Sequence, residues 1–76
     1  MTPIEVELSK LSPSPARDFA DPAKLERCGV FDWSKYQPIE LEQEGTRLIV
    51  VNGMTRVELA RRAGITHLPA YVYPTR

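Results

Sequence analysis

The sequence contains few of the residues from which most enzymatic and metal sites are built. Cysteine and histidine occur once each in 76 residues, as Cys28 and His67. A single cysteine excludes an internal disulfide and a cysteine-rich zinc site, and we expect Cys28 to be a small buried apolar residue rather than a nucleophile. The acidic residues and His67 have no spacing typical of a metal site, so the sequence predicts no metal ligands.

Long apolar runs are missing as well. No segment approaches the roughly 20 apolar residues of a membrane-spanning helix, and the N-terminus lacks the basic and apolar regions of a signal peptide. The hydrophobic content of 42% is nevertheless typical of a folded protein. We therefore expect residues 1–76 to form one soluble domain that does not insert into a membrane.

The formal net charge is zero, but the two parts of the chain differ in sign. Residues 1–45 contain five basic and nine acidic residues, which gives a net charge of −4, whereas residues 46–76 contain five arginines and one glutamate, which gives +4. The planar guanidinium of arginine fits phosphate through two parallel hydrogen bonds. The second part is therefore a phosphate-binding face, a face for an acidic partner or an ordinary solvated surface.

Five segments have the periodicity or the boundary residues of a regular element. They are a strand at 4–8, a helix from Asp21 to Gly29, a hairpin at 38–51, a helix from Thr55 to Gly64 and a strand at 68–73. Strands and helices mixed in this order predict an α+β fold. We expect a small mixed β-sheet with two or three short helices packed against it.

The second predicted helix has an unfavourable charge at its start. Thr55 and Glu58 match a capping box, in which each side chain accepts a hydrogen bond from the other residue's backbone. Glu58 can also pair with Arg62 one turn further on. Arg56 places a cation at the positive end of the helix dipole, which typically costs ~0.3–1 kcal/mol. Arg56 is therefore either a surface accident or the partner of an anion.

Several potential phosphate ligands lie close together before this helix. The Asn52-Gly53 turn lets the backbone approach a ligand, because glycine has no side chain. The N-terminus of a helix offers N–H groups to anions, while Thr55 adds a hydroxyl and Arg56 a guanidinium. The candidate phosphate-binding residues are therefore Asn52, Gly53, Thr55 and Arg56. Arg17 and Asp18 lie in a loop, where binding residues are frequent, and are candidates to complete the pocket.

Cleavage of a phosphate ester would also need a group that accepts a proton. Arg56 would stabilise charge on the phosphate, and Glu58 or His67 would transfer protons. Histidine is a frequent general base, although a lone histidine at a strand start, such as His67, is more often structural. Mg²⁺ is the metal we would expect if the reaction uses one.

The order of these motifs resembles the ParB/sulfiredoxin-like superfamily over nearly the whole chain. The matching segments are the P-x-R-x-F box at 15–19, Gln37-Pro38-Ile39, Asn52, residues 53–60, Gly64 and Leu68-Pro69-Ala70. Residues 53–60 have the glycine and the arginine of a G-x-x-R-x-x-A motif, with the alanine one position later. Met54 stands where sulfiredoxins have their catalytic cysteine and cannot perform that chemistry, so we do not expect sulfiredoxin activity. Asn52 and Thr55 replace a common aspartate and a frequent histidine of the family.

The resemblance implies a function on phosphate groups of nucleotides or nucleic acids, which by position would be bound by Gly53, Thr55 and Arg56. The sequence is most similar to ParB-like domains at the C-termini of bacterial polymorphic toxins of the Rhs type. That similarity implies a nuclease toxin, secreted as part of a larger delivery protein, active in the target-cell cytoplasm and neutralised by a cognate immunity protein. The alternative is a regulatory or interaction module that binds CTP or ATP without cleavage.

Overall fold

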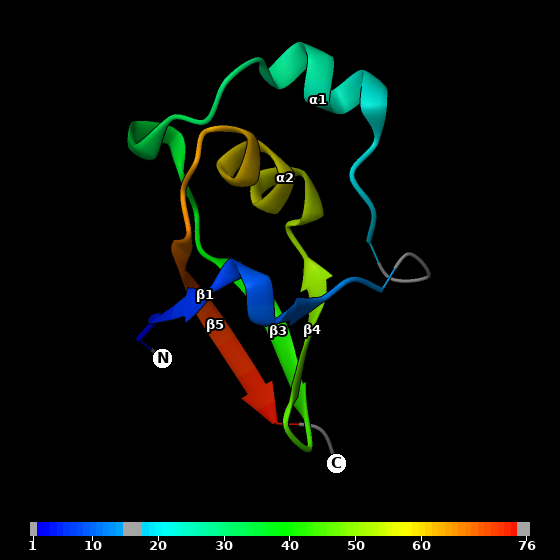
Figure 1. Ribbon diagram of the computed structural model, residues 1–76, viewed down its shortest axis with the longest axis vertical. Coiled ribbons are helices and arrows are strands. Elements are labelled where there is room, and N and C mark those ends of the chain that lie inside the picture. Colours follow the sequence, from blue (N-terminus) through cyan, green and yellow to red (C-terminus); the bar gives the residue numbers. More distant parts are fainter. Residues whose placement is uncertain (1, 15–17, 75–76) are drawn as a thin grey trace.

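Figure 1 shows the fold as a computed structural model, in which residues 2–14 and 18–74 are described. Regular elements cover most of these residues. In chain order they are β1 (Ile4–Glu7), the 3-10 helix η1 (Leu8–Lys10), β2 (Leu11–Ser12), α1 (Pro22–Cys28), the 3-10 helix η2 (Trp33–Lys35), β3 (Ile39–Glu44), β4 (Arg47–Asn52), α2 (Met54–Arg62) and β5 (His67–Pro74). The expected α+β class is confirmed.

The strands form one mixed sheet in the order β1-β5-β3-β4-β2. The β3–β4 and β1–β5 pairs are antiparallel, whereas β3–β5 and β4–β2 are parallel. The parallel neighbours β3 and β5 cannot be joined by a tight turn, and the chain between them passes through β4 and α2. This crossover places the start of α2 directly after the end of β4 (Figure 1).

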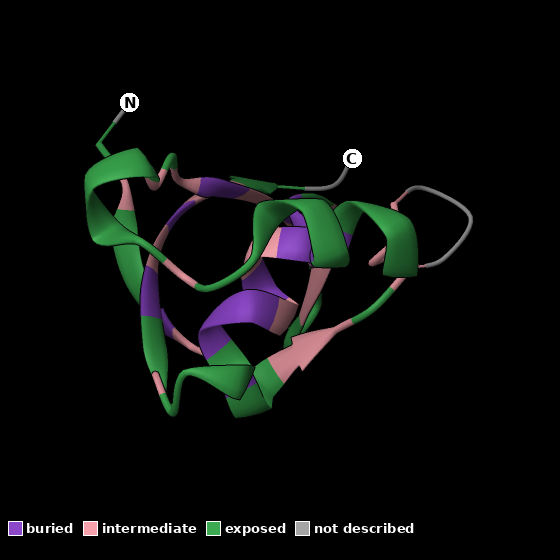
Figure 2. Ribbon diagram, turned by 90° about the horizontal axis from the view of Figure 1, so that it is seen from above, coloured by how far each residue is buried: buried purple, intermediate pink, exposed green. Residues whose placement is uncertain are grey.

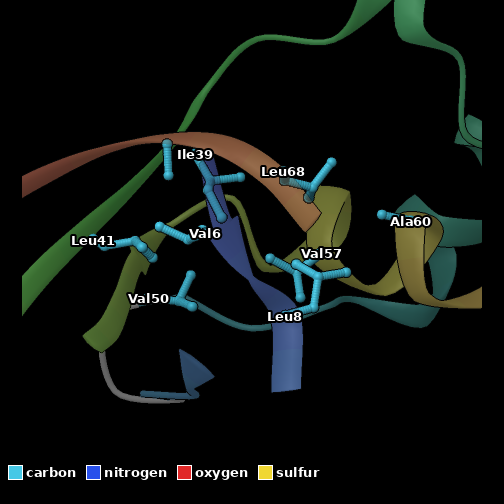
Figure 3. Close-up of a cluster of buried hydrophobic side chains, with 9 residues drawn as sticks. Val6, Leu8, Ile39, Leu41, Val50, Val57, Ala60 and Leu68 are labelled. Atoms are coloured by element: carbon cyan, nitrogen blue, oxygen red, sulfur yellow. The ribbon is translucent and has the colours of Figure 1, made fainter. Parts of the chain in front are cut away.

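The core lies between the sheet and α2. Strand alternation turns every second residue of β3 and β5 towards the core. Figure 2 shows buried residues on the strands and on α2, whereas α1 is mostly exposed. The buried cluster consists of Val6, Leu8, Ile39, Leu41, Val50, Val57, Ala60, Leu68 and Ala70 (Figure 3). Burial of a large aliphatic side chain contributes roughly 1.5–3 kcal/mol. The core therefore fixes α2, and with it the β4–α2 turn, against the sheet.

The hairpin and α1 agree with the sequence prediction. The β3 and β4 strands pair as expected, and α1 has Asp21 as its N-cap and ends at Gly29. The first strand is shorter than predicted, because Leu8 already belongs to η1. The β2 strand was not predicted, since two residues are too few to show a strand periodicity.

Two local predictions are wrong. Cys28 is exposed, because it ends a seven-residue helix that buries only Leu25. The capping box does not form, because the N-cap of α2 is Gly53, which has no side chain, and not Thr55. Thr55 lies within the first turn of α2 and is buried, at 7% exposure. Glu58 instead pairs with Arg62, with Oε1 and Nε 3.3 Å apart.

The helices in the described residues are too short or too polar to cross a membrane.

Candidate functional site

The N-terminal end of α2 binds an anion that belongs to the protein itself. Asp18 Oδ2 accepts hydrogen bonds from the backbone N–H groups of Gly53, at 2.7 Å, and of Met54, at 2.9 Å. An α-helix leaves its first amides without partners inside the helix, and here a loop carboxylate satisfies two of them. Asp18 therefore performs the capping that the sequence assigned to Thr55.

The pKa of Asp18 reflects these contacts. Burial raises the pKa, but hydrogen bonds from the amides of Met54, Gly53 and Phe19, together with the charge of Lys24, outweigh it and hold the pKa below its usual range. The carboxylate is therefore ionised at neutral pH. The structure brings Asp18 to the predicted site, while Arg17, the other expected pocket residue, lies outside the described residues.

Arg56 has a structural contact that the sequence did not suggest. Its Nη1 donates to the carbonyl oxygens of Gln37, at 2.6 Å, and Pro38, at 3.2 Å. These bonds connect α2 to the segment that enters β3, so the half-buried side chain helps to position both elements. They use one nitrogen of a guanidinium that carries five N–H donors, which leaves donors for a ligand.

Gly53 is required by the conformation and by the packing of the β4–α2 turn. Its φ of +114° lies in a region that residues with side chains rarely adopt. A Cβ atom at this position would lie 2.5 Å from Ile39 Cγ2 and 3.2 Å from Arg56 Nη2. The glycine therefore has a folding role that is independent of any ligand.

A hollow of about 400 Å³ opens beside Arg56, and we call it the Arg56 pocket. Its lining residues are Gln37, Pro38, Glu40, Asn52, Arg56, Tyr71 and Tyr73. Asn52 Nδ2 donates to Glu40 Oε1 at 2.9 Å. Burial and the neighbouring Glu40 carboxylate, which also forms a hydrogen bond with the phenol, raise the pKa of Tyr73. The lining residues thus include one arginine, one glutamate, two residues with side-chain amides and two tyrosines.

Sequence reasoning did not identify Glu40, Tyr71 and Tyr73 as site residues. Glu40 lies opposite Tyr71 because β3 and β5 are parallel neighbours. The outward position of each residue follows from strand alternation, but their proximity depends on the strand order. Only a correct prediction of the β4–α2–β5 crossover would have revealed it.

The other two proposed catalytic residues lie away from the Arg56 pocket. Glu58 pairs with Arg62 and with Arg61, whose Nη1 is 3.7 Å from Glu58 Oε2. His67 begins β5 opposite Glu7, and its Nδ1 lies 2.9 Å from Thr66 Oγ1. Neither residue lines the Arg56 pocket.

A preformed metal site is also missing from the part of the chain that the structure describes. No three His, Cys, Asp or Glu side chains there come close enough together to hold an ion. Glu40 is the one carboxylate in the lining of the Arg56 pocket. A protein cage for Mg²⁺ therefore does not exist among these residues.

The fold is similar to solved structures of the chromosome-partitioning protein ParB from Caulobacter crescentus. A C-terminally truncated ParB complexed with CTP-γ-S matches 97% of this chain and 45% of its own length, with a TM-score of 0.77 and 21% sequence identity. A C-terminally truncated ParB complexed to the centromeric parS site matches 96% of this chain and 38% of its own, with a TM-score of 0.62 and 20% identity.

The chain thus spans less than half the length of these two ParB structures. No protein-family model matches the sequence, and no curated protein matches it. At 20–21% identity the likeness concerns the fold. The ParB-like fold expected from the order of the motifs is therefore confirmed.

Proposed function

We propose that this domain is a nucleotide-binding module that holds the phosphates of a nucleoside triphosphate at the start of α2. The observation that carries the proposal is the Asp18 carboxylate, which sits on the amides of Gly53 and Met54. Two donors that converge on one carboxylate oxygen form a geometry that also suits a phosphate oxygen. The similarity to ParB complexed with CTP-γ-S supports a nucleotide as the source of that phosphate.

In this proposal the ligand replaces Asp18. A triphosphate carries more charge than one carboxylate, and it can contact Arg56 at the same time as the helix amides. The Nη1 bonds to Gln37 and Pro38 would keep the guanidinium in place before the ligand arrives. Such preorganisation reduces the entropy that binding must overcome.

CTP is the first ligand to test, and ATP is the second. Mg²⁺ commonly binds through phosphates and a few protein oxygens rather than a full protein cage. Because the described residues form no metal cage, we expect Mg²⁺ to bind together with the triphosphate.

Binding is favoured over cleavage by the separation of the proposed catalytic residues. A nuclease would need Glu58 or His67 beside the phosphate at Arg56. Glu58 is instead engaged by Arg61 and Arg62, and His67 contacts Thr66 at the other end of the α2–β5 connection. The nuclease, the delivery protein and the immunity protein rest on the sequence resemblance alone and stay predictions.

Replacement of Arg56 tests the phosphate site. We expect Arg56→Ala to weaken CTP binding about tenfold or more, because a hydrogen bond to a charged group contributes roughly 1.5–3 kcal/mol. Arg56→Lys should recover only part of this loss, since lysine keeps the charge and lacks the planar fork. The measurement is isothermal titration calorimetry with CTP and with ATP in the presence of Mg²⁺.

Arg62→Ala is the matched control. Arg62 lies on the same helix, pairs with Glu58 and does not line the Arg56 pocket. Its nucleotide affinity should equal that of the wild type. Thermal unfolding of each variant separates lost binding from lost folding, because Arg56 also contacts Gln37 and Pro38. If the wild type binds neither CTP nor ATP at millimolar concentration, the proposed function is wrong.

A further inference from the structure

Apolar side chains that the core does not cover lie in the chain between α1 and β3. Val30 is 83% exposed and Trp33 is 54% exposed. Phe31 and Tyr36, in the same segment, instead pack against the core cluster. Trp33 meets Phe31 edge to face, with ring centroids 4.8 Å apart. Core packing therefore accounts for Phe31 and Tyr36, but it leaves apolar surface of Val30 and Trp33 in contact with water.

This segment forms one wall of a groove that α2 completes. Figure 1 shows α1 and the chain that follows it on the side of α2 that faces away from the sheet. Two mostly apolar hollows of about 340 Å³ and 160 Å³ lie there, and they share the lining residues Val30, Phe31 and Leu59. Leu59 is buried, at 8% exposure, and lies outside the core cluster. We call the two hollows together the α1–α2 groove.

The wall of the α1–α2 groove is held in place by contacts within the domain. Tyr36 Oη donates a hydrogen bond to the carbonyl oxygen of Pro69 at 2.5 Å, which connects the segment to β5. Asp32 Oδ1 caps η2 by accepting a hydrogen bond from the Ser34 amide at 3.0 Å. A groove that exists before a partner arrives reduces the conformational entropy that binding must overcome.

Basic side chains surround the α1–α2 groove. Among the described residues, four basic residues and one acidic residue line its two hollows, namely Arg27, Lys35, Arg56, Arg62 and Asp32. Arg62 pairs with Glu58. Arg27 and Lys35 form no ion pair with any residue in the described part of the chain. An apolar surface with a basic rim is complementary to a segment that combines apolar with acidic side chains.

We propose that the α1–α2 groove is a docking site for an acidic peptide segment of a partner protein. An apolar residue of that segment would fill the larger hollow, and its carboxylates would face Arg27 and Lys35. Exposed apolar surface with a polar rim marks protein–protein contacts, and aromatic residues and arginine are enriched in them. The inference goes beyond the proposed function and does not depend on it, although Arg56 lines both the groove and the Arg56 pocket.

A peptide fits the α1–α2 groove better than a nucleic acid, which the cations alone would also attract. Bases stack on open faces of aromatic rings. Phe31 and Tyr36 are instead half-buried and pack on one another, with centroids 5.6 Å apart. The groove beside them is lined by Val30 and Leu59. This aliphatic surface suits an apolar side chain rather than a sugar-phosphate backbone.

The first measurement identifies the class of ligand. A phage library of random linear peptides is selected on the nucleotide-free domain, and the recovered peptides are titrated by fluorescence polarisation. We expect these peptides to share a large apolar residue flanked by glutamates or aspartates. Their affinity should fall as NaCl is raised from about 0.1 M to about 1 M, because salt screens the basic rim. Recovery of basic peptides, of uncharged peptides or of none would overturn the proposal.

Val30→Glu and Lys35→Glu locate the binding site. The first places a carboxylate on the apolar wall, and the second reverses one charge of the rim. We expect each to weaken binding of the selected peptides about tenfold or more, because it removes a contact and repels their acidic residues. Both residues are exposed, so folding should be preserved, which circular dichroism checks.

Ile4→Glu and Arg47→Glu are the matched controls. Both residues are exposed and line neither hollow, and the two substitutions make the same changes in charge as Val30→Glu and Lys35→Glu. The controls should bind the selected peptides as the wild type does. If they lose as much affinity as Val30→Glu and Lys35→Glu, the peptides respond to the total charge of the domain, and the proposed docking site is wrong.

Other occupants of the groove give different results. Binding of single-stranded oligo(dT), with the same dependence on Val30 and Lys35 and without binding of acidic peptides, would make the groove a nucleic-acid site and overturn the proposal. A wild-type dimer that Val30→Glu dissociates in sedimentation velocity would overturn it as well, because a second copy then covers the groove. A wild type that binds acidic peptides but neither CTP nor ATP supports the docking site and overturns the proposed function alone.

Discussion

Gly53→Ala is expected to destabilise the domain by about 3 kcal/mol or more, because two costs add at one position. The φ of +114° is strained for any residue with a side chain, and a left-handed conformation costs an L-residue about 1–2 kcal/mol. The new Cβ would also lie 2.5 Å and 2.9 Å from two atoms of Ile39, a residue with no exposed surface. Overpacking of a core typically costs another 1–3 kcal/mol.

Gly64→Ala separates the two costs. Gly64 also has a positive φ, +78°, but nothing lies within 4 Å of the position of its Cβ. We expect this variant to lose about 1–2 kcal/mol. The difference between the two variants then measures the clash with Ile39 together with the tight contact to Arg56 Nη2. Urea denaturation followed by circular dichroism gives both values. Equal losses in the two variants would mean that the packing around Ile39 yields to the added methyl group.

Gly53 shows how far a local pattern can be interpreted. From the sequence we predicted a turn at Asn52-Gly53, and we interpreted the glycine as a position where the backbone approaches a ligand closely. The structure gives a conformational and steric reason that needs no ligand. A glycine in a turn is therefore weak support for a binding site until its φ and its neighbours are known.

Elements with local signals were predicted from the sequence. The β3–β4 hairpin follows from strand alternation on both sides of a glycine turn, and α1 follows from Asp21-Pro22 and Gly29. What the sequence could not predict depends on residues that lie far apart along the chain. Asp18 reaches the amides of Gly53 and Met54 across 35 residues, and no local motif signals that contact.

The same limit applies to Arg56. Helix dipoles disfavour a cation at the start of a helix, so the sequence left Arg56 as either a surface accident or the partner of an anion. In the fold, Asp18 provides a negative charge at the N-terminus of α2, and the guanidinium reaches away to two carbonyl oxygens. The cation is therefore compatible with a stable helix. In the proposed function, a triphosphate would take the place of Asp18 on the α2 amides and would use other N–H donors of the same guanidinium.

Asp18→Ala is expected to lower stability and to raise nucleotide affinity in the same protein. Loss of a helix cap typically costs about 0.5–2 kcal/mol. In the proposed function the triphosphate must displace Asp18 from Gly53 and Met54, so removal of the carboxylate also removes that competition. A competition of ~1.4 kcal/mol corresponds to a tenfold gain in affinity. Calorimetric titration with CTP and urea denaturation at pH 7 measure the two effects.

Asp21→Ala is the matched control, because Asp21 caps α1 by accepting a hydrogen bond from the Ala23 amide at 3.1 Å. This variant should lose stability without any gain in CTP affinity, since α1 takes no part in the phosphate site. If Asp18→Ala behaves in the same way as Asp21→Ala, Asp18 is a helix cap only, and the phosphate binds elsewhere or not at all.

The stability difference between wild type and Asp18→Ala should also depend on pH. The pKa of Asp18 is lowered in the folded state, so the unfolded chain takes up the proton first as the solution is acidified. The contribution of Asp18 is therefore fully present above its unfolded pKa, near 3.8, and is lost as the pH falls through the lower folded value. Urea denaturation at pH 7 and at about pH 3 should show the two proteins converging in acid. If the difference in free energy of unfolding between the two proteins is the same at both pH values, the carboxylate charge on the α2 amides does not stabilise the fold. A phosphate at that position would then have no charged competitor.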